Sequence, residues 1–114
     1  MTDKFNKVKP AELAADLKAF DKLEPVIHSK ARLAIVSVLA ASESLSFVEL
    51  RDGLRLTDGN LAAHLRALEQ ARFVTLKKVG AETKPVTSIS LTATGRTAFT
   101  RYLEGLEHII NRHR

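Results

Sequence analysis

Residues Ser46–Leu76 read SFVELRDGLRLTDGNLAAHLRALEQARFVTL, and most of the fold follows from this segment. Ser46 followed by Glu49 has the spacing of a capping box, in which each side chain bonds a free backbone amide at the start of a helix. A helix should therefore begin at this point. Its apolar side chains recur at helical spacing, at Phe47, Leu50 and Leu54, and we expect it to end near Leu54.

A second helix is expected after a short link. Thr57 is a good N-cap, and Asp58 follows in the first turn, where the helix dipole favours a negative charge. Apolar side chains again recur at helical spacing, at Leu61, Leu65 and Leu68. Two helices this short, with so short a link, must cross at a large angle. The pattern over residues 46–71 predicts a helix-turn-helix, whose second helix (58–71) can enter the major groove of DNA.

Two alternating segments then predict a β-hairpin over residues 73–92. Residues 73–77 and 87–91 alternate between apolar and polar side chains, and a polar stretch from Gly80 to Pro85 separates them. One face of the hairpin carries Val74, Leu76, Ile89 and Leu91. Helix, turn, helix and hairpin is the order of a winged helix-turn-helix, a mainly α fold of the α+β class with a two-stranded β wing.

Several separated strings resemble the winged-helix DNA-binding domains of the ArsR/MarR-like transcriptional regulators of bacteria and archaea, and most closely their small single-domain group. The matching strings are Thr57-Asp58-Gly59-Asn60-Leu61, His64-Leu65, Leu68-Glu69, and Leu91-Thr92 with Gly95-Arg96. The resemblance extends over about residues 25–110. It implies a DNA-binding regulator in which the terminal helices, often with the first helix, form a two-fold dimer.

Length and composition predict one domain, residues 10–114, behind a flexible N-terminus at residues 1–9. The chain has 114 residues, of which 45% are hydrophobic and 27% charged, as is ordinary for a globular protein. No apolar run approaches the ~20 residues that span a bilayer, and the first residues lack a hydrophobic signal core. We therefore expect a cytoplasmic protein. Because there is no cysteine, disulfides, thiol nucleophiles and Cys-ligated metals are excluded.

Four further elements are expected around the helix-turn-helix and the hairpin. A first helix should begin at Pro10 and run to about Leu23. A second, from about His28 to Ala41, is apolar around much of its circumference, which predicts a central, buried position. Leu45 is expected to add a short strand to the hairpin. The last helix should span about residues 93–111.

The last helix carries two adjacent apolar rows. One consists of Phe99, Leu103, Leu106 and Ile110, and the other of Ala98, Tyr102, Gly105 and Ile109. A terminal helix needs one row for its own core, so the second predicts a partner helix and a homodimer. The expected dimer interface comprises Leu13, Leu17, Phe20, Phe99, Tyr102, Leu103, Gly105, Leu106, Ile109 and Ile110. The alternative is one wide stripe buried within a single protomer.

The net charge of +5 is concentrated on the hairpin and the end of the chain. Residues 72–94 carry +3 and residues 95–114 carry +2, whereas residues 58–71 carry −1. A basic wing beside a nearly neutral helix suits phosphate contacts by the wing and base contacts by the helix. The alternative is that wing lysines only discourage edge-to-edge strand pairing.

The expected DNA-contacting residues lie on the helix side opposite the leucines and on the wing. They are Thr57, Asp58, Asn60, Ala63, His64, Arg66, Ala67, Lys77, Lys78, Thr83 and Lys84. Asn60 can bond adenine bidentately, and His64 can donate to a guanine acceptor or a phosphate. Thr57 and the first helix amides suit a phosphate, and the alanines permit close approach to the bases.

Other functional classes fit the sequence less well. The four histidines show no partnered spacing of the kind that an enzyme requires. A metal sensor needs clustered ligands, but His108 and His113 do not share a helix face. We therefore expect a homodimeric repressor that binds double-stranded operator DNA, with no enzyme activity, metal or cofactor. Two alternatives stay open: a winged helix that binds a protein instead of DNA, and a small-molecule effector of DNA binding.

Overall fold

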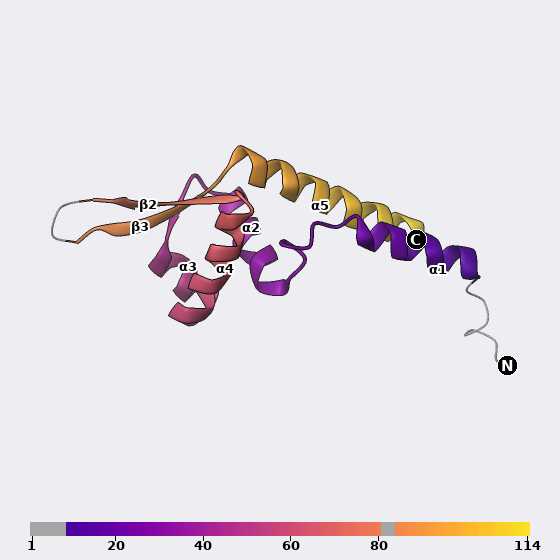
Figure 1. The fold of residues 1–114 in the computed structure, drawn as a ribbon, viewed down its shortest axis with the longest axis horizontal. Helices are drawn as coiled ribbons and strands as arrows, with labels where there is room; N and C mark the ends of the chain where they lie inside the picture. Colours follow the sequence, from indigo (N-terminus) through magenta and orange to yellow (C-terminus); the bar gives the residue numbers. More distant parts are fainter. Residues whose placement is uncertain (1–8, 81–83) are drawn as a thin grey trace.

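The described part of the chain forms helices and a small set of short strands (Figure 1). The computed structural model describes residues 9–80 and 84–114. Its elements are α1 (Pro10–Asp21), α2 (Lys30–Ala40), β1 (Leu45–Ser46), α3 (Phe47–Gly53), α4 (Asp58–Gln70), β2 (Val74–Val79), β3 (Val86–Leu91) and α5 (Ala93–Arg112). The winged helix-turn-helix and the long last helix predicted from the sequence are thus present. The expectation for the N-terminus concerns residues outside those described, except Lys9.

The core is centred on α2. Ile35, Val36 and Leu39 of this helix are fully buried, and α2 contacts α4, α5 and β3. The prediction of a central helix is confirmed, although α2 begins at Lys30 and not near His28. The reason is local: Ser29 is the N-cap, and its Oγ accepts a hydrogen bond from the Arg32 amide.

The helix-turn-helix begins at the caps that the sequence indicates. Ser46 Oγ accepts from the Glu49 amide at 3.0 Å, and Glu49 Oε1 accepts from the Ser46 amide at 2.8 Å. Thr57 Oγ1 accepts from the Asn60 amide at 3.1 Å and so starts α4. Leu61, Leu65 and Leu68 of α4 are buried in the core, as expected.

α3 and α4 end in the same backbone motif. After α3, the Leu56 amide donates to the Arg51 carbonyl at 2.9 Å, and after α4 the Phe73 amide donates to the Leu68 carbonyl at 2.9 Å. In both, the residue after the C-cap has a left-handed backbone, with φ 56° at Arg55 and 65° at Arg72. This is the Schellman ending, which usually has glycine at that position. An arginine there is strained, because its Cβ crowds the following carbonyl.

The sheet has the strand order β1-β3-β2 and is antiparallel throughout. Val74 pairs with Leu91 and Leu76 with Ile89, so the four residues expected on the apolar face lie opposite one another. Leu45 of β1 also pairs with Ile89, which is fully buried at the centre of the sheet. The predicted hairpin and the short strand at Leu45 are therefore confirmed.

The base of the wing is joined tightly to α5. Thr92 caps α5 through a bond from the Gly95 amide to its Oγ1, and its hydroxyl donates to the Arg72 carbonyl at 2.6 Å. A Cβ on Gly95 would lie 2.1 Å from the Phe73 carbonyl oxygen. Only glycine fits at this crossing, so the start of α5 is held against the end of α4 and the start of β2.

α1 and α5 form an antiparallel pair that extends away from the wing (Figure 1). We call this pair the stalk. Its far end is held by Arg112, whose Nη2 lies 2.8 Å from Asp16 Oδ1 and also donates to the Glu12 carbonyl. The resulting molecule is elongated, with extents of 69 × 27 × 22 Å.

Replacing Arg72 with glycine should stabilise the fold. Glycine relieves the left-handed strain of about 1–2 kcal/mol, and the greater freedom of the unfolded chain offsets part of this. We expect the free energy of unfolding, measured by urea denaturation, to rise by about 0.5–1 kcal/mol. Arg66→Gly is the control, because Arg66 is exposed within α4 and the same change there should cost about 1 kcal/mol. Destabilisation by both variants would contradict the strain argument.

Candidate nucleic-acid interface

One side of α4 is exposed and built from small or polar residues. Because the three leucines face the core, the opposite side of α4 faces solvent. The exposed residues at its start and along this side are Thr57, Asp58, Gly59, Asn60, Ala63, Arg66 and Gln70, and Ala67 is half-buried. Apart from the adjacent residues and the backbone of α4 itself, no described atom lies within 4 Å of where a Gly59 Cβ would be placed. We call this surface the α4 face; Gly59 and Gln70 were not among the residues expected from the sequence.

The negative charge at the start of α4 is paired with an arginine from α3. Asp58 Oδ1 accepts from Arg51 Nη1 at 3.0 Å, and Arg51 Nε donates to Asp52 Oδ1 at 2.9 Å. The hydrogen bonds that Arg51 donates to Asp52 and Asp58 raise the pKa of Arg51 further above its already high value. Asp58 was expected to contact DNA, and its side chain remains largely exposed beside Arg51, so this contact stays a prediction. Sequence reasoning missed Arg51, because its partner is on another helix.

His64 does not lie freely on the exposed side, as the sequence had suggested. It follows Leu61 by three residues and precedes Leu68 by four, so it borders the buried stripe and is half-buried. Its Nδ1 accepts a hydrogen bond from Arg32 Nε of α2 at 3.2 Å. The outward position expected for His64 is corrected to the edge of the α4 face, beside α2.

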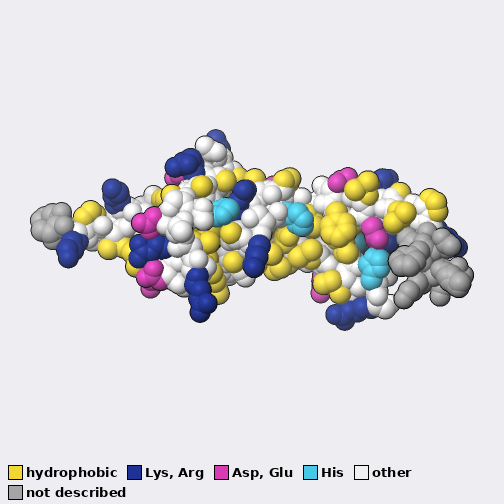
Figure 2. Space-filling view, turned by 90° about the horizontal axis from the view of Figure 1, so that it is seen from below, with side chains coloured by type: hydrophobic (Ala, Val, Ile, Leu, Met, Phe, Trp, Pro, Cys, Tyr) yellow, Lys and Arg dark blue, Asp and Glu magenta, His cyan; other side chains and the backbone are white. Residues whose placement is uncertain are grey.

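The wing carries exposed lysines on both of its faces. Lys77 and Lys78 are consecutive on β2 and opposite Ser88 and Thr87, so their side chains leave the strand in opposite directions. Lys84, just before β3, is also exposed. Figure 2 shows basic side chains above and below the wing, at its left. Thr83, also expected to contact DNA, lies outside the described residues.

Arg55 is a further exposed cation that sequence reasoning missed. It lies in the turn between α3 and α4, two residues before the N-cap Thr57, and has the strained backbone described above. A basic residue inside the turn of a helix-turn-helix is the sequence signal that points to it. Together with the wing lysines, it adds exposed positive charge outside α4.

The stalk exposes a set of large apolar side chains. The exposed fractions are 58% for Leu13, 63% for Leu17 and 47% for Phe20 on α1, and 45% for Leu103 and 49% for Ile110 on α5. Figure 2 shows hydrophobic side chains over this part of the molecule, at its right. Phe99, Leu106 and Ile109 are partly buried and pack against the core of the same protomer.

Two residues expected in the dimer interface lie inside the protomer instead. Tyr102 is buried, and its hydroxyl is 2.8 Å from His28 Nδ1. A Cβ on Gly105 would lie 2.8 Å from Leu23 Cδ2, so the glycine permits close approach of Leu23 from the same chain. The row of Tyr102 and Gly105 therefore serves the protomer's own core, whereas the exposed large apolar residues of α5, Leu103 and Ile110, belong to the other row.

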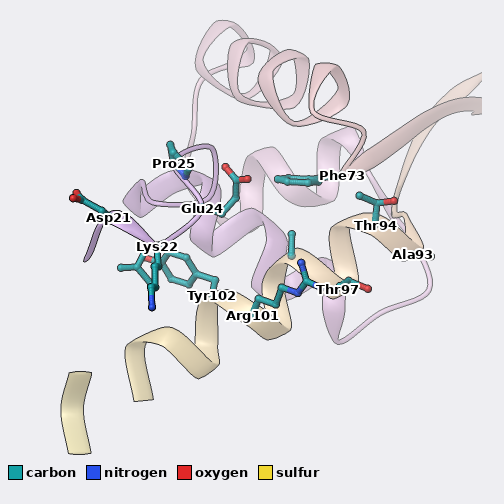
Figure 3. Close-up of a pocket in the computed structure, with 12 residues that line it drawn as sticks. Asp21, Lys22, Glu24, Pro25, Phe73, Ala93, Thr94, Thr97, Arg101 and Tyr102 are labelled. Carbon is teal, nitrogen blue, oxygen red and sulfur yellow. The ribbon is translucent and has the colours of Figure 1, made fainter. Parts of the chain in front are cut away.

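A groove of about 580 Å³ lies where the stalk meets the rest of the molecule (Figure 3). The segment 21–25, Phe73 and the first half of α5 line it. Its charged residues are Lys22 and Arg101 with Asp21 and Glu24, and Glu24 Oε2 also accepts from the Val26 amide at 2.9 Å. The groove combines an aromatic wall with charges of both signs.

Neither a membrane span nor a metal cluster is found in residues 9–80 and 84–114. No helix in these ranges is long and apolar enough to cross a bilayer. The same ranges contain no group of three or more His, Asp or Glu side chains placed to hold a metal ion.

Comparison with known proteins gives consistent matches over most of the chain. A family model described as a winged helix DNA-binding domain matches residues 31–110. The uncharacterized protein MJ0432 of Methanocaldococcus jannaschii is 38% identical over 78 residues, which are 68% of this chain and 85% of that protein.

Solved structures show the same fold. The structure of a transcriptional regulator homologue from Pyrococcus horikoshii OT3 has a TM-score of 0.77 and 31% identity, and the match covers 85% of this chain and 95% of that one. A second is the S. aureus MepR–DNA complex, with a TM-score of 0.70 and 18% identity over 90% of this chain and 84% of MepR. At that identity, the likeness to MepR shows the fold alone.

Proposed function

The chain belongs to the winged-helix DNA-binding domain family of transcriptional regulators, and from this we propose that it is a sequence-specific repressor that binds operator DNA as a homodimer. The observation that carries the proposal is the α4 face: an exposed surface of small or polar residues, preceded by the exposed Arg55 and followed along the chain by a wing with exposed lysines. Such a surface suits a major groove bordered by phosphates.

In the proposed complex, α4 lies in the major groove. Asn60 bonds an adenine through both amide atoms, while Ala63 and Ala67 allow the helix to approach the base edges. Arg66, and Thr57 with the first amides of α4, contact phosphates. Arg51 pairs with the exposed Asp58, so the guanidinium offsets the negative charge of this carboxylate where the DNA approaches. Lys77, Lys78, Thr83 and Lys84 contact the backbone or the minor groove, and the bound protein blocks the promoter.

The exposed apolar residues of the stalk support the homodimer. Within the described part of one protomer, five large apolar side chains of the stalk remain 45–63% exposed: Leu13, Leu17, Phe20, Leu103 and Ile110. A second copy with the same set satisfies a two-fold interface, because each patch is its own complement. Two protomers then present two recognition helices to half-sites about one DNA turn apart, which raises affinity. Phe99, Leu106 and Ile109 extend this interface at its edge.

We place the small-molecule effector, which the sequence left open, in the groove beside Phe73 and Arg101. Its volume of about 580 Å³ is within the usual range for ligand sites, and it touches both the stalk and the start of β2. A ligand there contacts the two parts whose relative position sets the distance between recognition helices. An operator-bound regulator of this kind acts in the prokaryotic cytoplasm.

Selection of genomic fragments with the purified protein tests the proposal. A palindromic or pseudo-palindromic site, bound with a steep salt dependence, is the expected result. Weak binding without sequence preference would leave a general DNA-packaging role. Absence of binding at low salt would favour the alternative function, a winged helix that binds a protein partner.

Replacing Lys77 and Lys78 with alanine should weaken binding to every DNA sequence. If each lysine neutralises one phosphate, the slope of log affinity against log salt falls by about 2. Salt titrations of cognate and random DNA measure this slope. Lys9→Ala with Lys18→Ala, at and within α1, is the charge-matched control and should leave the slope unchanged. An unaltered slope in the Lys77/Lys78 variant would remove the wing from the interface.

Replacing Arg55 with glycine should stabilise the fold and weaken DNA binding. The glycine relieves the left-handed strain, so urea denaturation should show a gain of about 0.5–1 kcal/mol. Loss of the guanidinium should lower affinity for cognate and random DNA alike and reduce the salt slope by about 1. Arg72→Gly is the matched control: it makes the same backbone change at the opposite end of α4, about 20 Å away, and should leave DNA binding intact. Equal DNA affinity of the two variants would rule out a contact by Arg55.

Replacing Leu17 and Leu103 with glutamine should dissociate the dimer without unfolding the protomer. Both side chains are about half exposed or more, so their loss costs the protomer little. Sedimentation equilibrium should show at least a tenfold rise in the dimer dissociation constant. Val48→Gln, at a similarly exposed position on α3, is the control. A monomeric wild-type protein at micromolar concentration would contradict the proposed assembly.

A further inference from the structure

One arginine connects the central helix, the loop before it and the recognition helix. Arg32 Nε lies 3.2 Å from His64 Nδ1 on α4, and its Nη1 donates to the Val26 carbonyl at 3.2 Å. The backbone amide of Arg32 donates to Ser29 Oγ, so both the backbone and the side chain of Arg32 have hydrogen-bond partners. Arg32 and His64 are both half-buried. The expected DNA-contacting set includes His64 but not Arg32, so it gives this arginine no role.

The hydrogen bond determines the state of the imidazole. A guanidinium has five N–H donors and no acceptor, so His64 Nδ1 must be the acceptor and carries no hydrogen. The ring is then neutral, with its proton on Nε2. A doubly protonated ring would point an N–H at Arg32 and bring two cations together. Arg32 thus selects the Nε2–H tautomer of His64.

The remaining ring nitrogen is available at the edge of the α4 face. No hydrogen bond to His64 Nε2 is found among the described residues, and His64 lies one helical turn from Asn60. An Nε2–H can donate to guanine N7 or O6, to adenine N7 or to thymine O4. Cytosine presents an amino donor in the major groove, and this group is mismatched to an N–H.

We propose that Arg32, which does not itself touch DNA, is a positioning residue for base recognition: it holds His64 as an Nε2–H donor that selects an acceptor-bearing base and discriminates against cytosine. This inference rests on the proposed binding of α4 in the major groove. It adds a residue of α2 to the determinants of specificity, and it makes His64 a hydrogen-bond donor toward the bases.

The position of Arg32 is itself secured by neighbouring contacts. The loop that supplies Val26 also carries His28, whose Nδ1 lies 2.8 Å from Tyr102 Oη on α5. Ile27 and Leu23 of the same loop are buried in the core. A side chain with fixed partners holds its target in one geometry, which specific recognition requires.

Nuclear magnetic resonance of the free protein tests the tautomer directly. With the histidines ¹⁵N-labelled, and His64 assigned from the His64→Ala spectrum, wild-type His64 should show a hydrogen-free Nδ1 and a protonated Nε2. Arg32→Met, which keeps an apolar stem but removes the donors, should give a mixture of tautomers. A protonated Nδ1 in the wild-type protein would overturn the proposal.

Base preference tests the recognition role. Affinities are measured for operators varied at each position. At one base pair per half-site, the Arg32→Met variant should discriminate against cytosine about three- to tenfold less than the wild-type protein. His64→Ala should lose preference at the same base pair, and the double variant should lose no more than His64→Ala alone.

Ser29→Ala is the matched control, because it loosens the same loop and helix start without removing the donor to His64. It should leave base preference unchanged. An equal loss of affinity for all sequences in Arg32→Met would show a merely structural role. Additive losses in the double variant would show that the two residues act separately. A protein that binds no DNA would reject the proposed function as well, whereas DNA binding with unchanged preference in Arg32→Met rejects only this inference.

Discussion

Burial of Leu61, Leu65 and Leu68 against α2 is the constraint on which the rest of the structure depends. Each buried leucine contributes about 1.5–3 kcal/mol, so α4 has one stable rotation about its axis. That rotation turns the small and polar residues outward as the α4 face. It also brings Asp58 within hydrogen-bond distance of Arg51 on α3, and His64 within hydrogen-bond distance of Arg32 on α2. The proposed chemistry of recognition therefore follows from the packing of the core.

A second set of contacts relates the recognition helix to the stalk. Thr92 bonds the end of α4 and caps α5, and Gly95 allows α5 to cross the Phe73 carbonyl without a Cβ. The direction of α5 is thus fixed relative to α4 and the wing. If α5 and α1 pair with a second copy, this junction sets the separation of the two recognition helices. The groove beside Phe73 lies at this junction, which is why we place an effector there.

Local signals were predictable from the sequence, and contacts between distant elements were not. Ser46 with Glu49, the Thr57 cap and the apolar face of the hairpin depend on residues a few positions apart or on strict alternation, so their spacing is visible in the chain. The Arg32–His64 bond joins residues 32 positions apart, and its existence depends on how α2 and α4 cross. Likewise, the two adjacent rows of α5 look equivalent until Leu23 is placed against Gly105.

Methylation protection of guanine N7 on the selected operator tests the central claim most directly, because N7 lies in the major groove. If the α4 faces of two protomers read bases, protected guanines should form two clusters, about 10–10.5 base pairs apart or a multiple of this. Protection confined to one cluster would contradict the dimer. Tight binding without any major-groove protection would contradict recognition by α4.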